Sequence, residues 1–170
     1  MACSSPRLLV WVGSDPTCET ASRSFLASLE REVESRSYRL APGARLNKLT
    51  FACRTILDWP SVKRQLDYGT EVTVLQLGSL AAAGREHCGG GLLFQAWTPA
   101  LQDLLKIIER RDQTLTQFGF GHDELLALIR AVNGRGVDRI VPVGQALTFH
   151  RYWDGYDLLR EFTRTVYFEP

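Results

Sequence analysis

The sequence has 170 residues, close to the usual size of one domain, so we expect a single compact unit over residues 1–170. Its 20 Lys+Arg against 19 Asp+Glu give a formal net charge of +1, and the basic residues are dispersed along the chain. A basic surface that could bind nucleic acid is therefore not expected. Because no segment reaches the roughly 20 apolar residues that span a bilayer, we expect no membrane span. Unpaired cysteines and an N-terminal apolar run too short for a secretory signal favour a cytoplasmic location.

The first expected element is a strand over Leu8–Val12, a continuous apolar run that ends at Gly13. Such a run is typical of a strand buried on both faces. A helix should follow it, capped by Ser14 or Asp15 and with Pro16 in its first turn. The apolar stripe of this helix is expected to comprise Ala21, Phe25, Leu29 and Val33.

A loop at Pro42–Gly43 should separate this helix from a second one. A third, short helix is expected over residues 61–67. The apolar residues of the second helix recur at helical spacing, and we expect them to face the core. They are Leu49, Ala52, Cys53, Ile56 and Leu57.

Two further β-prone runs follow, Val72–Leu77 and Leu92–Trp97, and Thr98-Pro99 then predicts the start of a helix that continues to Ile108. Between the two runs lies the triple glycine 89–91. It precedes a strand and opens no helix, so it does not meet the structural requirement of a phosphate-binding turn.

The last third of the sequence predicts a strand over Leu115–Phe120 and a helix that ends at Asn133-Gly134. Ile140–Val143 should form another strand, in which Pro142 favours an edge position. Asp154 can cap a final helix through residue 162, followed by an extended segment at residues 166–168. Strands that alternate with helices in this way predict an α/β fold, with a mostly parallel sheet flanked by helices.

The four cysteines are far apart and form no Cys-x-x-Cys pair, so neither structural zinc nor a redox dithiol is expected, and we predict no metal site. One of them, Cys3, lies just before the first strand, on a loop where a thiol is accessible. It can act as a covalent nucleophile if its surroundings raise the thiolate fraction. The alternative reading is a terminal thiol without function.

The segment around the candidate nucleophile, Ala2-Cys3-Ser4-Ser5-Pro6-Arg7-Leu8-Leu9-Val10, resembles the active-site cysteine segment of the LuxC-type acyl-CoA reductases, which supply aldehyde for bacterial luminescence. Residues 136–147, Gly-Val-Asp-Arg-Ile-Val-Pro-Val-Gly-Gln-Ala-Leu, followed by Trp153-Asp154-Gly155-Tyr156-Asp157, are similar to the C-terminal signature of the same family. The two motifs occur in the family's order, so the resemblance covers essentially the whole chain.

The resemblance implies an aldehyde dehydrogenase-like catalytic domain, in which Cys3 accepts an acyl group from a fatty acyl-CoA or an acyl-protein. NADPH would then reduce the bound thioester to a long-chain fatty aldehyde. The family's cofactor-binding domain precedes the cysteine, so we expect that domain, the general base and half of the oxyanion hole to be absent from this chain. An acyl-transfer protein and a second copy of the chain are further partners that the resemblance suggests.

The resemblance also points to Glu86, because a glutamate-rich segment of the aldehyde dehydrogenase superfamily contacts the nicotinamide ribose. His87 and Cys88 depart from that pattern, since an apolar residue and a phenylalanine stand there in the superfamily. Without the family, the His87-Cys88 pair could suggest a metal site, but neighbouring residues of an extended segment point to opposite faces. A solvated loop is the favoured interpretation of His87.

Three residues of the C-terminal signature, Trp153, Asp154 and Tyr156, are candidates for the substrate pocket. The structural alternative makes Asp154 a helix cap and the two aromatic residues packing groups. His150 and Arg151, on the preceding loop, are expected at the solvated surface.

A different class of function remains open at this point: a binding or assembly module that retains the fold and performs no chemistry. The reactivity of the Cys3 thiol would distinguish the two. A thioesterase-like role finds no convincing His and Asp partners in the sequence.

Overall fold

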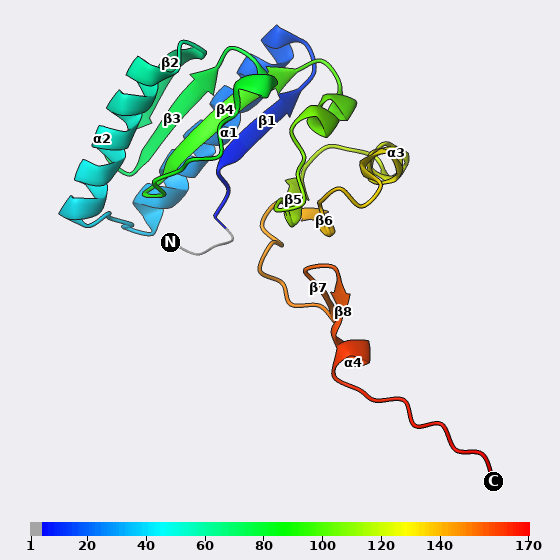
Figure 1. Ribbon diagram of the computed structural model, residues 1–170. Coiled ribbons are helices and arrows are strands. Elements are labelled where there is room, and N and C mark those ends of the chain that lie inside the picture. Colours follow the sequence, from blue (N-terminus) through cyan, green and yellow to red (C-terminus); the bar gives the residue numbers. More distant parts are fainter. Residues whose placement is uncertain (1–4) are drawn as a thin grey trace. The chain divides into compact units, whose positions relative to one another are not determined.

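The computed structural model describes residues 5–170, so the candidate nucleophile Cys3 lies outside the described residues. The chain divides into two compact units, Met1–Ile107 and Ile108–Pro170. Whether the two units act as one catalytic domain, as the sequence suggests, stays a prediction. The first unit contains a four-stranded sheet with a long helix on each face (Figure 1).

The sheet of the first unit is mostly parallel, as expected. Its strands are β1 (Leu8–Val12), β2 (Val62–Tyr68), β3 (Val72–Leu77) and β4 (Leu92–Thr98), in the spatial order β1-β4-β3-β2. β1 and β3 run parallel to β4, whereas β2 runs antiparallel to β3. β1 is thus a terminal strand, and its residues are half-buried instead of buried on both faces. Full burial was wrong because a terminal strand has a neighbour on one side only.

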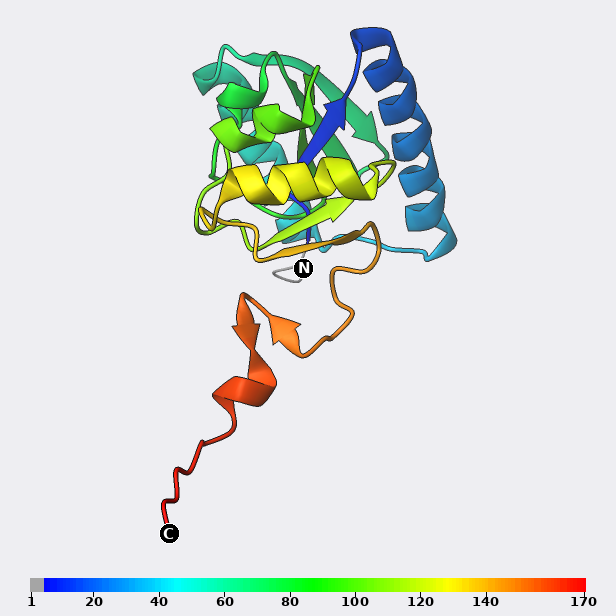
Figure 2. The same cartoon turned by 90° about the vertical axis from the view of Figure 1, so that its right-hand side faces the viewer.

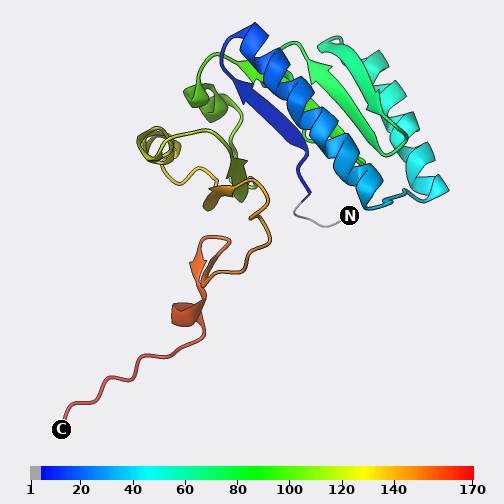
Figure 3. The ribbon, with the colours of Figure 1, turned by 180° about the vertical axis from the view of Figure 1, so that it is seen from behind.

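α1 (Asp15–Ser35) covers one face of this sheet (Figure 3). Leu26 forms a core there with three strand residues, Val72, Val74 and Leu93, and the partly buried Phe25, Leu29 and Val33 pack around them. The helix therefore uses most of its expected stripe. Ala21, however, is exposed, and the most deeply buried positions are Cys18, Ser22 and Leu26.

α2 (Pro42–Asp58) lies on the opposite face of the sheet and begins at the proline that was expected in a loop (Figures 1 and 3). Its buried residues are Lys48, Ala52 and Thr55. The predicted apolar stripe was largely wrong, since Leu49 is 57% and Leu57 is 83% exposed. Lys48 can face the sheet because its Nζ donates a hydrogen bond to a loop carbonyl oxygen, at Thr70 (2.9 Å).

Two predicted helices of the first unit were wrong in kind or length. Residues 61–67 form most of strand β2, whose backbone pairs with β3 across a turn at Gly69 (φ +61°). The helix expected from Thr98 to Ile108 is only a short 3-10 helix, Leu101–Lys106, and a second 3-10 helix covers Leu80–Ala82. Pairing with β3, the next strand in the chain, decided the first case, and the pattern of residues 61–67 alone does not reveal that pairing.

The second unit contains a parallel pair of strands, β5 (Thr114–Gln117) and β6 (Arg139–Pro142), linked through α3 (His122–Val132). α3 ends where predicted, with Asn133 in the left-handed conformation (φ 47°). A hairpin of β7 (Tyr152–Trp153) and β8 (Tyr156–Asp157) and the short α4 (Leu158–Glu161) follow it in the chain (Figure 2). Residues 166–168 form no strand.

The hairpin corrects the role expected for Asp154. This residue and Gly155 have positive φ angles, of 50° and 82°, and form the two-residue turn between β7 and β8. An Asp-Gly pair is a preferred sequence for such a turn. Asp157, not Asp154, precedes the final helix as its N-cap.

None of the helices formed by residues 5–170 is both long and apolar enough to cross a bilayer.

Candidate functional site

Two segments that carry predicted site residues lead into neighbouring parallel strands of the first unit. Arg7 precedes β1, and its carbonyl oxygen accepts a hydrogen bond from the backbone N–H of Phe94 in β4 (2.8 Å). Residues 85–91 lead into β4 itself. Because parallel neighbours begin at the same edge of a sheet, the residues just before β1 and those just before β4 share that edge. Arg7 and His87 are close enough there for their charges to interact.

His87 is half-buried at this edge, so the solvated position favoured by the sequence was wrong. Its ring meets the ring of Phe94 edge-on, with 5.9 Å between centroids and 71° between planes. Burial lowers the pKa of His87; a backbone hydrogen bond at Leu92 opposes this, and the positive charge of Arg7 lowers the pKa further. The imidazole is therefore neutral at pH 7.

The hydrogen bonds of His87 decide what its ring can do. Nδ1 accepts a hydrogen bond from the backbone N–H of Gly89 (2.9 Å), so the proton of the neutral ring is assigned to Nε2. Nε2 is buried and has no hydrogen-bond partner among the described residues. In this state His87 has a buried N–H that forms no hydrogen bond of ordinary geometry within residues 5–170, although the backbone of Leu92 is close enough to raise the pKa of the ring.

The residues on either side of His87 differ in exposure. Glu86 is exposed to solvent. Cys88 is half-buried, and burial raises the pKa of its thiol, although a backbone hydrogen bond and the charge of Lys48 counteract this. A thiol with a raised pKa is a poor nucleophile at neutral pH. Cys88 is therefore not an attractive alternative to Cys3.

The other two cysteines of the described chain lie on the helices α1 and α2, not in the segments that precede β1 and β4. Cys18 is 1% exposed in the core beneath α1, and burial together with the negative charge of Asp15 raises its pKa. Cys53 is exposed on α2. Within residues 5–170, no three His, Cys, Asp or Glu side chains are grouped so that they could hold a metal ion.

The substrate-pocket candidates lie in the β7–β8 hairpin of the second unit. The Trp153 ring packs against the guanidinium of Arg139, 4.5 Å from the ring centroid, and stacks on Phe149 (5.7 Å). Arg139 also donates hydrogen bonds to three carbonyl oxygens of the loop between β6 and β7. Trp153 thus helps to hold this loop, which is the packing role given above as the alternative to a place in the substrate pocket.

The turn of the hairpin packs closely against the ion pair of Arg110 and Asp138. Arg110 donates two hydrogen bonds to the carboxylate of Asp138 (3.0 and 2.9 Å), and this pairing raises the pKa of Arg110. A Cβ atom on Gly155 would lie 3.0 Å from the Asp138 carboxylate, so a larger residue would crowd the turn. Tyr156 is 57% exposed beside this pair and remains open to a ligand.

The two loop residues expected at the surface differ in their contacts. Arg151 donates a hydrogen bond to Asp157 (3.1 Å) across the hairpin and another to the hydroxyl of Tyr152. His150 is exposed, and its ring stacks on that of Tyr152 (5.6 Å). Arg151 therefore has a structural role in the hairpin that the sequence did not predict.

The chain matches no protein-family model, and no curated protein has a sequence significantly similar to it.

Proposed function

We propose that this chain is the cysteine-bearing catalytic part of a LuxC-type, NADPH-dependent acyl-CoA reductase with an aldehyde dehydrogenase-like fold. The observation that carries the proposal is the shared edge of β1 and β4. The segments that the resemblance selects as cysteine segment and ribose-contacting segment precede two adjacent parallel strands. Three residues separate Cys3 from Arg7 in the sequence. An extended segment of that length spans up to about 14 Å, which would allow the thiol to approach His87.

The proposed reaction begins with the thiolate of Cys3 and the carbonyl carbon of a fatty acyl thioester. A new S–C bond forms at Cys3, the bond from that carbon to the CoA sulfur breaks, and the CoA thiolate leaves and takes a proton from solvent. This covalent step divides one difficult reduction into two easier steps. An acyl-protein thioester could donate the acyl group in the same way.

His87 offers a donor for the charge that develops on the acyl oxygen. Its Nε2–H is buried, unpartnered among the described residues and belongs to a neutral ring. A preorganised donor of this kind stabilises a tetrahedral oxyanion, typically by about 3 kcal/mol. His87 acts here as a donor and not as a base, because Nδ1 is already occupied by the Gly89 N–H.

The resemblance assigns one residue of this chain, Glu86, to the nicotinamide cofactor. The carboxylate of Glu86 is exposed, so it can accept hydrogen bonds from ribose hydroxyl groups. NADPH would supply the hydride that converts the acyl thioester to the aldehyde. Most of its binding surface would belong to a separate cofactor domain.

The decisive experiment is covalent acylation of the purified chain. After incubation with a long-chain acyl-CoA, intact-mass spectrometry should show one added acyl group, mapped to Cys3 by peptide analysis. Cys3→Ala should abolish the adduct, whereas Cys53→Ala, which removes the exposed thiol on α2, should leave it unchanged. Acylation that is lost with Cys53 instead of Cys3 would refute the proposal.

The second candidate, a non-catalytic binding or assembly module, is supported by a different observation. α2 presents four exposed apolar side chains at helical spacing, Leu46, Leu49, Ile56 and Leu57, and such a patch often marks an interaction surface. A module of this kind needs no reactive thiol. Alkylation of Cys3 no faster than that of Cys53, over a range of pH, would favour it.

A further inference from the structure

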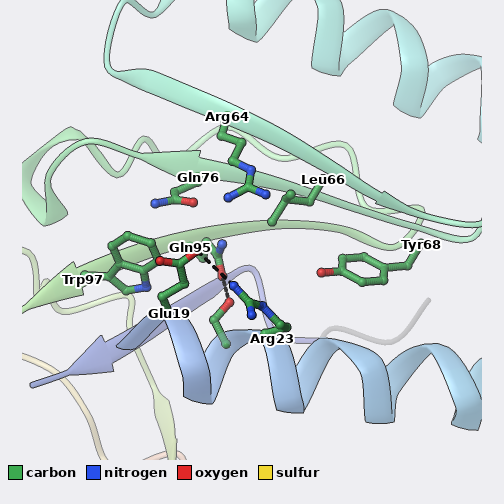
Figure 4. A pocket seen from close by; sticks show the side chains of 9 residues that line it. Glu19, Arg23, Arg64, Leu66, Tyr68, Gln76, Gln95 and Trp97 are labelled. Carbon is green, nitrogen blue, oxygen red and sulfur yellow. Dashed lines mark hydrogen bonds and ion pairs between the residues drawn. The ribbon is translucent and has the colours of Figure 1, made fainter. Parts of the chain in front are cut away.

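A second polar feature of the first unit is a small cavity between α1 and the face of the sheet that α1 covers (Figure 4). Its volume is about 50 Å³, room for roughly four water molecules or the oxygen atoms of one tetrahedral anion. The residues that line it come from α1, β2, β3 and β4. They are Glu19, Ser22, Arg23, Arg64, Leu66, Tyr68, Gln76, Gln95 and Trp97.

The deepest polar group of this cavity is the amide of Gln95, a residue that is only 1% exposed. Its Oε1 accepts two hydrogen bonds, from Trp11 Nε1 (3.1 Å) and from Ser22 Oγ (2.8 Å). Two donors fix the oxygen end of the amide, so the NH2 end points away from them, toward the cavity (Figure 4). Trp97 adds a ring N–H that is buried and lacks a hydrogen-bond partner among the described residues.

The rim of the cavity carries a net positive charge. Arg23 and Glu19 form an ion pair of 3.3 Å, one turn apart on α1, and so largely cancel each other. Arg64 forms no ion pair within the part of the chain that the structure describes. One positive charge therefore remains uncompensated above two buried N–H donors.

The position of Arg64 depends on an irregularity in β2. The pairing of β2 with β3 shifts between Val62 and Arg64, which makes Lys63 the extra residue of a β-bulge and sets Arg64 opposite Gln76. Bulges frequently direct a side chain toward a site. Gln76 and Trp97 also lie near the carboxyl ends of the parallel strands β3 and β4, where open α/β sheets commonly bind ligands.

We propose that this cavity binds a phosphate group, held by the guanidinium groups of Arg64 and Arg23 and by the buried N–H donors of Gln95 and Trp97. The proposal is independent of the acyl-CoA reductase proposal, because it uses no residue of the β1 and β4 starting edge. The phosphate could be inorganic phosphate or the phosphomonoester of a larger molecule. A CoA thioester carries such a group at the ribose 3′ position.

The test is phosphate binding by the full chain, measured by calorimetry with inorganic phosphate as the probe. Arg64→Gln should weaken binding about tenfold or more, because a charge-assisted hydrogen bond is lost. Glu19→Gln should strengthen binding, because it removes the one carboxylate of the cavity and releases Arg23. Arg31→Gln is the matched control, since Arg31 is an exposed arginine of the same helix that does not line the cavity.

CoA and dephospho-CoA distinguish the two sources of the phosphate. If CoA competes with inorganic phosphate and dephospho-CoA does not, the site binds the CoA phosphomonoester; if neither competes, it binds free phosphate. The proposal is overturned if phosphate does not bind the wild-type chain at millimolar concentration, or if Arg64→Gln and Arg31→Gln bind it equally. Circular dichroism of each variant checks that these exposed substitutions leave the fold intact.

Discussion

At the scale of single residues, Glu71 is a buried carboxylate with several hydrogen-bond donors around it. Its carboxylate accepts hydrogen bonds from the Leu40 N–H (2.6 Å), from Thr70 (2.8 Å) and from Arg45 (2.8 Å). Burial alone would raise the pKa of Glu71, but these hydrogen bonds and the charges of Arg45 and Arg39 outweigh it and hold the pKa below its ordinary value. The ionised carboxylate thus stabilises the join between α2 and the β2–β3 turn.

This lowered pKa predicts a pH dependence of stability. The folded chain binds fewer protons at Glu71 than the unfolded chain, so the contribution is complete above the ordinary pKa of 4.5 and is lost as the pH falls below it. Urea unfolding at several pH values should show that Glu71→Gln lowers stability at neutral pH and flattens the loss on acidification. Glu34→Gln, at an exposed position of α1, should leave the profile of the wild-type chain unchanged.

A second residue-scale prediction concerns the glycine that precedes β4. Gly91 has a φ of +73°, and a Cβ atom there would lie 2.0 Å from the carbonyl oxygen of Glu71. Gly91→Ala should therefore lower the free energy of unfolding by well over the ~1–2 kcal/mol that a left-handed conformation alone costs an L-residue. Gly69→Ala is the control, because Gly69 has a similar φ of +61° with nothing within 4 Å. Equal losses in the two variants, measured by chemical denaturation, would contradict the close contact.

The site residues show what the sequence could and could not predict at this scale. Glu86 is exposed, as a cofactor contact would require, but the half-buried position of His87 depends on packing against Phe94, which local sequence patterns do not reveal. The phosphate cavity was missed for the same reason. Gln95 lies in a predicted strand and Arg64 in the predicted short helix over residues 61–67, and neither position marks a binding site. Only the sheet and the β2 bulge bring both residues to the face that α1 covers.

At the scale of elements, α2 gives the clearest difference between pattern and structure. Periodicity identified the helix correctly but not the side that faces the sheet, because Lys48 and Thr55 are buried and Leu49 and Leu57 are exposed. The apolar stripe of a helix usually faces the protein core, but the apolar stripe of α2 is exposed. Here the polar side is held by specific contacts such as Lys48 to Thr70.

Two substitutions in α2 test this orientation. Leu49→Ala should change the free energy of unfolding by less than about 0.5 kcal/mol, as expected for a surface position, whereas a core leucine would cost 2–5 kcal/mol, roughly. Ala52→Leu, at a position that is 1% exposed, should cost about 1–3 kcal/mol because the helix cannot accommodate the added volume. A large loss for Leu49→Ala would place that face in the core and refute the structure of α2.

The other elements fall into two groups, those determined by their own residues and those determined by pairing with another segment. β1, β3, β4 and α3 were predicted within a residue or a few, because a continuous apolar run or a well-marked helix end determines each of them. β2 and the β7–β8 hairpin were missed. β2 exists through its pairing with β3, and the hairpin through an Asp-Gly turn that the sequence also permits as a helix start.

At the scale of the whole molecule, the mixed α/β architecture and the mostly parallel sheet followed from the alternation of strands and helices. Strand order did not follow, because it depends on which strands meet after the helices have crossed the sheet. The order β1-β4-β3-β2 matters for the proposed chemistry, since it makes β1 and β4 neighbours. Had another strand separated them, His87 could not serve the residues that precede β1.

The last prediction separates the two half-reactions of the proposed reductase. Acylation needs a nucleophile and a donor for the acyl oxygen, which Cys3 and His87 would supply, whereas reduction also needs a nicotinamide site, toward which the described chain offers Glu86. The purified 170-residue chain should therefore take up one acyl group from a long-chain acyl-CoA but should not consume NADPH faster than a Cys3→Ala control. His87→Ala should slow acylation about 100-fold, the effect of losing one oxyanion donor. If the chain produces aldehyde from acyl-CoA and NADPH above that control, it contains a cofactor site that the β1–β4 edge does not explain.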